Sequence, residues 1–213
     1  MKIILAAVDE PLANAWNAAC GDLDFVTVHH GSILDLKCDA VVSPANSFGF
    51  MDGGIDALYS QHFGWKVQQR LQALIREKHH GELLVGAADI VDTDDPRMPF
   101  LVAAPTMRVP MILANTVNPF LAARAVLLLV QHGTFSSGEL KGEPISDAVK
   151  SVAFPGLGTG VGRVPPNTCA RQLRSAIDDV LLGQNAFPVT WLDAQTRHQK
   201  LYTDRVRDLQ FGE

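Results

Sequence analysis

The stretch Ala40-Val-Val-Ser-Pro-Ala-Asn-Ser-Phe-Gly-Phe-Met-Asp-Gly-Gly-Ile-Asp56 has the pattern of a buried strand, a loop and the start of a helix. Its first four residues are apolar or small, which favours a strand covered on both faces. The loop ends in two glycines, and a helix is expected from about residue 56 to residue 62. Because ligands bind beyond the carboxyl ends of strands in open α/β sheets, this loop is a candidate binding site.

A second stretch, Phe154-Pro-Gly-Leu-Gly-Thr-Gly-Val-Gly-Arg-Val-Pro165, again leads from a strand toward a helix. Glycine lets the backbone approach a ligand closely, and amides at a helix N-terminus attract anions. The Walker loop is excluded because Arg163 and Val164 stand where it needs Lys and Ser or Thr, and no pair of glycines completes a GxGxxG fingerprint. One glycine-rich turn alone could be a plain connector. Two such loops side by side would hold a pyrophosphate.

Short apolar runs alternate with helical patterns along the rest of the chain, which is typical of a layered α/β domain. Apolar residues at helical spacing predict helices over residues 67–75 and 166–183. We expect one domain over residues 1–213, with surface excursions at 89–99 and 132–144 and a terminal helix within 194–213 docked on the sheet. The other expected strands lie at residues 2–8, 25–29, 83–85, 100–103, 151–154 and 188–192.

Composition narrows the possible partners. Of the 213 residues, 47% are hydrophobic and 19% charged, which fits a globular domain and excludes disorder and a fibrous fold. The net charge of −5 gives no reason to expect broad binding to nucleic acid or to an anionic membrane. The apolar runs are too short for a membrane span, and the three cysteines and seven histidines form no CxxC or HExxH motif. We therefore expect a cytoplasmic protein without a structural metal or a bound cofactor.

Four segments together resemble a known family. The run Ala40-Val-Val-Ser-Pro-Ala-Asn46, followed by Gly53-Gly-Ile-Asp56, is similar to the macrodomain signature of an NAAN-type strand end, a glycine run and a helix start. The run Ser151-Val-Ala-Phe-Pro-Gly-Leu-Gly-Thr-Gly-Val161 resembles the family's SIAFPxIxTGV segment. Between them, Gly81-Glu-Leu-Leu-Val and Phe100-Leu-Val-Ala-Ala-Pro105 fall in the order of the family's GEA and VIHxxGP strands. The resemblance covers about residues 31–182.

This resemblance implies a three-layer α/β/α sandwich with a mixed sheet of about six strands that binds ADP-ribose or an ADP-ribosylated substrate. It implies that Asn46 hydrogen-bonds the distal ribose and that Asp56 is the acidic residue at the helix start. The ligand-binding residues that it implies, together with candidates from the loops, are Ser32, Ile33, Ser43, Ala45, Asn46, Phe50, Gly53, Gly54, Ile55, Gly156, Gly158, Thr159, Gly160, Val161 and Gly162.

The sequence departs from the family pattern at three places. Ser32 stands where the family's Gly-Asp-Ile has the acid that holds the adenine amino group, so another acid, such as Asp35 or Asp193, would have to take that part. Gly162 replaces the aromatic residue that caps the distal ribose, and Phe48 or Phe50 could substitute for it. Met51 and Asp52 interrupt the glycine run and add a second carboxylate four residues before Asp56.

The resulting expectation is a hydrolase that cleaves an ADP-ribosyl bond or O-acetyl-ADP-ribose. Asn46 would orient the ribose, and Asp56, or Asp52 in its place, would activate water. The rival interpretation is a reader that binds ADP-ribose without turnover, and a third is an unrelated nucleotide-dependent enzyme. Simpler roles stay open: Asp56 could only stabilise its helix, Asn46 could only bond its own turn, and Arg108 could be solvated. The sequence does not set the oligomeric state.

Overall fold

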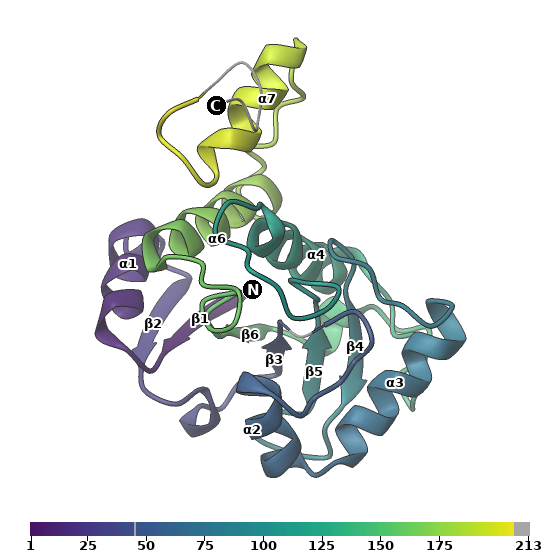
Figure 1. Ribbon diagram of the computed structural model, residues 1–213. Coiled ribbons are helices and arrows are strands. Elements are labelled where there is room, and N and C mark those ends of the chain that lie inside the picture. Colours follow the sequence, from purple (N-terminus) through teal and green to yellow (C-terminus); the bar gives the residue numbers. More distant parts are fainter. Residues whose placement is uncertain (45, 207–213) are drawn as a thin grey trace.

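The computed structural model describes residues 1–44 and 46–206 and has one six-stranded sheet between layers of helices (Figure 1). Across the sheet the strand order is β2-β1-β6-β3-β5-β4. Strand β4 is antiparallel to β5, and the other neighbours are parallel. The predicted mixed α/β architecture is confirmed. The strands are β1 (Lys2–Ala7), β2 (Val26–His30), β3 (Ala40–Ser43), β4 (Asp89–Asp92), β5 (Phe100–Ala103) and β6 (Ser151–Phe154).

Side chains alternate between the two faces of the sheet, and each face has its own hydrophobic core. In β1, Ile3 and Leu5 face the layer of α1 (Glu10–Cys20), α4 (Asn118–His132) and α6 (Pro166–Val180). Ile4 and Ala6 face the opposite layer, which contains α2 (Gly54–Phe63) and α3 (Lys66–Lys78). Apolar side chains on both faces explain why these strands are continuous apolar runs in the sequence. The short elements are η1 (Ile33–Asp35) and α5 (Ile145–Ala148).

Strand β6 occupies a central place in the sheet. Its residues pair with β1 from Lys2↔Ser151 to Leu5↔Phe154, and with β3 at Ala40↔Val152 and Val41↔Ala153. The first and last strands of the chain are therefore neighbours in the middle of the sheet. The carboxyl ends of β1, β6 and β3 lie side by side at one edge as a result.

Two predicted strands are wrong. Residues 83–85 form a loop, and the strand is β4, which occupies the first four residues of the predicted surface excursion at 89–99. An aspartate is normally expected at the surface, so the sequence favours a loop there. Asp89 is nevertheless only 1% exposed, because it is paired with Lys78 Nζ and His79 Nε2, each at 2.8 Å. The predicted strand at 188–192 instead runs into the start of α7 (Trp191–Lys200), which Thr190 caps.

The chain after α6 also differs from the expectation. The predicted terminal helix corresponds to α7, but this helix lies beyond α6 and not on the sheet (Figure 1), and Gln199 is its one buried residue. Residues 207–213 of that prediction lie outside the described residues. Within the part of the chain that the structure describes, no helix has the length and apolar character needed to cross a membrane.

Candidate active site

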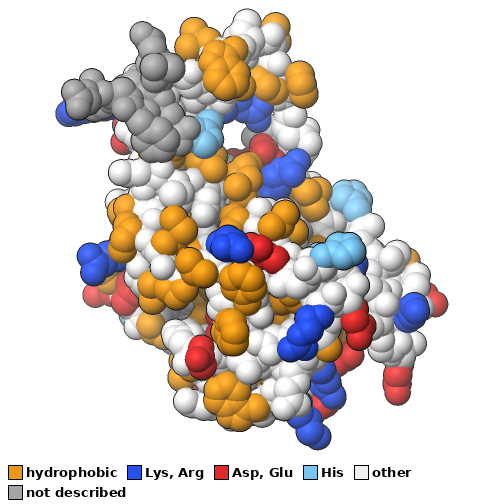
Figure 2. Space-filling model, turned by 45° about the vertical axis from the view of Figure 1, so that its right-hand side comes forward, with side chains coloured by type: hydrophobic (Ala, Val, Ile, Leu, Met, Phe, Trp, Pro, Cys, Tyr) orange, Lys and Arg blue, Asp and Glu red, His pale blue; other side chains and the backbone are white. Residues whose placement is uncertain are grey.

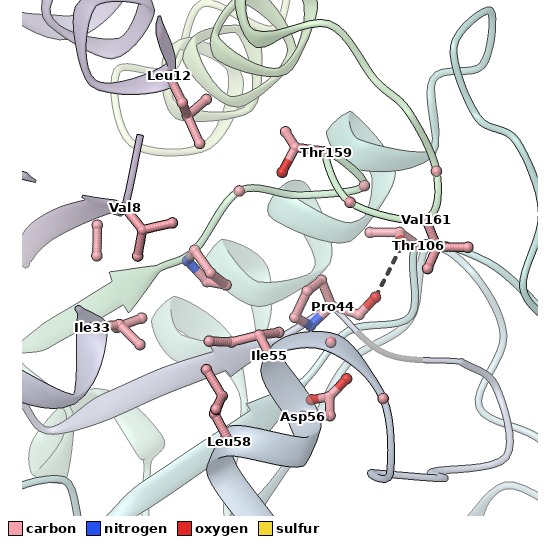
Figure 3. Close-up of a pocket in the computed structure, with 18 of the residues that line it drawn as sticks. Val8, Leu12, Ile33, Pro44, Ile55, Asp56, Leu58, Thr106, Thr159 and Val161 are labelled. Atoms are coloured by element: carbon pink, nitrogen blue, oxygen red, sulfur yellow. Dashed lines mark hydrogen bonds between the residues drawn. The ribbon is translucent and has the colours of Figure 1, made fainter. Parts of the chain in front are cut away.

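A cavity of about 360 Å³ lies at the carboxyl ends of β1, β6 and β3 (Figure 3). Nearly all the residues singled out in the sequence line it, and they come from three separate loops. Ser43 lies behind the cavity wall, and Ala45 lies outside the described residues. The predicted residues that the structure brings together in the lining are Ser32, Ile33, Asn46, Phe50, Asp52, Gly53, Gly54, Ile55, Asp56, Gly156, Gly158, Thr159, Gly160, Val161 and Gly162.

Met51 fixes the first loop to the core. Its side chain is fully buried, its N–H donates to Gln68 Oε1 of α3 at 2.7 Å, and its carbonyl accepts from Ser60 Oγ of α2 at 2.8 Å. Met51, which interrupts the glycine run, therefore anchors this loop to the core. The chain then turns at Gly54, whose φ of +56° is unfavourable for residues with a side chain, and enters α2.

Asn46 braces the same loop with its side chain. Its Oδ1 accepts from the N–H groups of Phe48 at 3.1 Å and Phe50 at 3.2 Å, and its Nδ2 donates to the Phe50 carbonyl at 2.8 Å. This is the turn-bonding role considered from the sequence. Asn46 also lines the cavity, and one N–H of its amide is left for a ligand hydroxyl.

Asp56 is a buried carboxylate in the first turn of α2 and borders the cavity below Pro44 (Figure 3). It is 6% exposed, and the Ser43 hydroxyl donates to its Oδ1 at 2.5 Å. Burial raises the pKa of Asp56 from 3.8 to about 7, while the hydrogen bond from Ser43 lowers it. Among the described residues no Lys, Arg or His side chain pairs with it. Asp56 can therefore exchange a proton near neutral pH.

Asp52 differs from Asp56 in its surroundings. It is exposed, and it also lines the cavity. The structure thus places one carboxylate in the wall and the other in an exposed position of the lining, both belonging to the same loop. Both line the cavity, but burial raises the pKa of Asp56 to about 7, which favours Asp56 as a base near neutral pH.

The second loop, residues 155–162, offers backbone amides. Among the described residues, the Leu157 N–H faces the Cys169 thiol, but the N–H groups of Gly156 and of residues 158–162 donate to no protein acceptor, so they are available to an anion. A Cβ on Gly162 would lie 2.5 Å from the Gly158 carbonyl oxygen, so this close approach excludes the family's aromatic residue. A Cβ on Gly160 would meet nothing within 4 Å, which leaves open space there for a ligand.

The lining carries negative charge and no basic side chain among its described residues. Its ionisable members are Asp9, Asp52 and Asp56. Arg108, considered as an anion ligand, instead binds Glu82 through two hydrogen bonds and lies over the ring of Phe48 at 5.2 Å. On the face in Figure 2, basic side chains are scattered among acidic and hydrophobic ones. An anionic ligand in this cavity would rely on backbone amides and helix N-termini.

Neither acid considered for the adenine amino group lines the cavity. Asp35 is exposed on η1 and does not line the cavity. Asp193 lies on α7, where its carboxylate accepts from the Thr190 N–H in a capping box. Of the two aromatic candidates, Phe50 lines the cavity and Phe48 does not.

The sequence model of the Macro domain family matches residues 42–173, which include β3, both glycine-containing loops and most of α6. The chain belongs to the Macro domain family. An uncharacterized protein of Aquifex aeolicus is 30% identical over 148 residues, 70% of this chain and 78% of the relative. A macro domain-containing protein of Caldanaerobacter subterraneus is 24% identical over 181 residues, 84% of this chain and 94% of the relative.

Solved macrodomains share the fold. The macrodomain of Mycobacterium tuberculosis DarG has a TM-score of 0.55 at 21% identity, with 72% of this chain and 90% of that chain covered. A mutant Oceanobacillus iheyensis macrodomain, solved with ADPR, has a TM-score of 0.53 at 19% identity, with 68% and 71% covered. At these identities the likeness establishes the fold of this macrodomain.

One wall of the macrodomain cavity lies before the matched segment. It consists of Ala6, Ala7, Val8, Asp9 and Leu12, from the end of β1 and the start of α1. Sequence reasoning missed these residues, although residues 2–8 were predicted as a strand. The available signal was that strand's carboxyl end, which in a parallel sheet lies beside the other ligand loops. A further part of the lining, also missed, follows β5 and includes Thr106, Met107 and Pro110.

Proposed function

We propose that this macrodomain binds ADP-ribose in the cavity and hydrolyses an ADP-ribosyl bond, with Asp56 as the general base. The observation that carries the proposal is the buried carboxylate of Asp56, whose pKa is raised to about 7, in the wall of a cavity opposite a loop of free amides. The solved relative from Oceanobacillus iheyensis holds ADPR, which supports the choice of ligand.

The proposed binding mode uses backbone donors for the diphosphate. The amides of Gly156 and of residues 158–162, with the N-terminus of α2, would hold it, which fits a lining without basic side chains. The free N–H of Asn46 and the polar backbone of Gly53 and Gly54 would contact the distal ribose. This placement brings the reacting end of the ligand to Asp56.

In the proposed reaction, a water molecule attacks the anomeric carbon of the distal ribose, or the carbonyl carbon of an ester on it. Asp56 takes a proton from that water as its oxygen forms the new bond. In attack at the anomeric carbon, the bond from that carbon to the acyl oxygen breaks and its electron pair stays on that oxygen, so the acid leaves as a carboxylate and Asp56 later gives its proton to solvent. In attack at the carbonyl carbon, the bond to the ribose oxygen breaks, and Asp56 returns its proton to that oxygen. Both routes release ADP-ribose and a carboxylate. Ser43 holds Oδ1 of Asp56, which leaves Oδ2 to accept the proton.

A second candidate function is a reader of ADP-ribose, and one observation favours it. Three of the hydrogen bonds that the Asn46 amide can make are used by its own loop, so it has little capacity left to orient a reacting ribose. A reader would bind the same ligand through the same amides and release no product.

The experiment measures binding and turnover separately. Calorimetry with ADP-ribose tests binding, and chromatography of released ADP-ribose tests turnover of O-acetyl-ADP-ribose and of a protein ADP-ribosylated on carboxylates. We expect Asp56→Ala to lower turnover by about a hundredfold with little change in ADP-ribose affinity. Tight binding without release would make the protein a reader. Full turnover in Asp56→Ala, with loss in Asp52→Ala, would move the base to Asp52.

A further inference from the structure

The segment between β5 and α4 is attached to the second loop of the cavity through Leu113. This side chain is fully buried, although residues 108–112 before it are exposed. Its N–H donates to the Gly162 carbonyl at 2.7 Å. Its Cδ1 lies 3.1 Å and 2.9 Å from the positions that a Cβ on Gly158 and a Cβ on Gly162 would take. Leu113 therefore bonds this loop and also fills the space beside its glycines.

The bond to Gly162 fixes the direction of peptide groups in the loop. Because a carbonyl and the N–H that follows it point in opposite directions in a trans peptide, the Arg163 N–H points away from Leu113. It donates to the Gly160 carbonyl at 3.0 Å, which orients the next N–H, that of Val161, away from Arg163. The free N–H of Val161, a residue of the cavity lining (Figure 3), is therefore oriented by a series of bonds that begins at Leu113.

Arg163 is held in an unfavourable backbone conformation. Its φ is +54°, in the left-handed region that residues with a side chain rarely adopt. Such a conformation persists only where the surrounding structure holds it in place. The residue before it, Gly162, is the one that Leu113 binds, so loss of the contact with Leu113 would let this part of the loop relax.

Leu113 is itself held by its own turn and by α6. Its carbonyl accepts from the N–H and from Oγ1 of Thr116, both at 2.9 Å. The Thr116 carbonyl accepts from Gln172 Nε2 at 2.8 Å, and Gln172 Oε1 accepts from the Phe120 N–H at 2.9 Å. Gln172 is fully buried in α6. Because a buried amide needs both partners, Gln172 ties the segment that carries Leu113 to this helix.

We propose that Leu113 is a positioning residue for the ligand's diphosphate. It holds the loop after β6 in the shape that presents its free amides to that group, and Gln172 supports it. Leu113 does not line the cavity, so it acts through the loop and not on the ligand. Donors that are already ordered bind more tightly, because little ordering is left to occur on binding. This inference rests on the proposed function for the identity of the ligand.

The test compares ADP-ribose with ADP by calorimetry in wild type, Leu113→Ala and Leu127→Ala, at a temperature where circular dichroism shows each protein folded. Both ligands carry the diphosphate, and ADP lacks the distal ribose. We expect Leu113→Ala to weaken the affinity for each ligand about tenfold, because the space that it empties lies beside the glycines of the loop. Leu127, in α4, is also fully buried and does not line the cavity. Leu127→Ala should therefore lower the melting temperature but keep both affinities within about twofold.

Two more variants separate positioning of the loop from general packing. Leu113→Met keeps nearly the same volume, so it should retain the wild-type affinity for both ligands. Gln172→Met keeps the length of the side chain but removes both of its hydrogen bonds, and it should weaken both affinities at least about threefold. If Leu113→Ala does not fold, Gln172→Met decides the question.

Unchanged affinity for both ligands in a folded Leu113→Ala variant, or an equal loss in Leu127→Ala, would overturn the role of Leu113 and leave ADP-ribose binding intact. Unchanged affinity in Gln172→Met overturns it where Leu113→Ala is unfolded. A loss for ADP-ribose alone would place the effect at the distal ribose and would also overturn the assignment to the diphosphate. If the wild type does not bind ADP-ribose, the proposed function fails and this inference fails with it.

Discussion

Replacing Asp56 with asparagine should stabilise the folded protein at pH 8. The side chain is 6% exposed, and the only hydrogen bond that it accepts among the described residues comes from Ser43, so its negative charge is poorly compensated. Asparagine has the same shape, keeps an oxygen for the Ser43 hydroxyl and carries no charge. The variant therefore removes the cost of a buried charge without opening a cavity.

The magnitude follows from proton linkage. The pKa of Asp56 is about 7 in the folded protein against 3.8 as the ordinary value, so between these values the folded state binds one more proton than the unfolded state. Wild-type stability therefore falls as the pH rises from about 4 to about 7 and is level above that. Integration between pH 5 and pH 8 gives a loss of about 2–3 kcal/mol.

Urea unfolding of both proteins at pH 5, 6, 7 and 8 measures this difference. We expect the stability advantage of Asp56→Asn to grow by about 2–3 kcal/mol from pH 5 to pH 8 and to stop growing above about pH 7. Asp52→Asn is the matched control, since the exposed residue should change stability by no more than about 0.5 kcal/mol at each pH. An advantage that is the same at every pH would refute the assignment of a poorly compensated, buried charge at Asp56.

Four other variants test the site and its supports. Gly160→Glu should lower ADP-ribose affinity at least a hundredfold in calorimetry while the melting temperature stays near wild type, because its Cβ meets nothing but its charge would face the diphosphate; Gly160→Ala is the control. Asn46→Ala should weaken affinity about tenfold and also slow turnover, since it releases the loop as well as removing a ribose contact; unchanged values for both would remove Asn46 from the site. Met51→Ala should cost about 2–5 kcal/mol in urea unfolding, because it empties a fully buried position, and a cost below 1 kcal/mol would contradict its role as an anchor. Ser43→Ala removes the bond that lowers the pKa of Asp56, so the acidic limb of the turnover profile should move upward from about pH 7; a downward shift would contradict this.

The sequence predicts most of this fold because four of the six strands, β1, β3, β5 and β6, are short, mostly apolar runs that are buried along nearly their whole length. It fails at β4, where acidic residues make the segment read as a loop. The burial of Asp89 depends on Lys78 and His79, which come from the end of α3 and the turn after it. No local sequence pattern predicts these ion pairs, because they form only once α3 lies against the edge of the sheet.

The candidate site, too, could be predicted only where it depends on residues that are close together in the sequence. Local spacing was enough to select Asp56 and the two glycine-containing loops, since strand, loop and helix follow one another in the chain. The wall formed by Val8 and Asp9 could not be selected in this way, because strand order is a property of the assembled sheet. Asp193 was a reasonable choice by residue type, but its distance from the cavity is set by the path of the chain after α6.

The central position of β6 has a consequence for how the protein folds. Before residues 151–154 are in place, β1 with β2 and β3 with β5 and β4 are separate half-sheets, each with an open edge. Pairing across such long separations is slow, and open edges attract other chains in the meantime. During synthesis on a ribosome, β6 emerges more than a hundred residues after β1, which takes about ten seconds at typical rates of elongation. Both half-sheets keep their open edges during this time. The yield of folded protein therefore depends on whether β6 pairs with both half-sheets before their open edges aggregate with other chains.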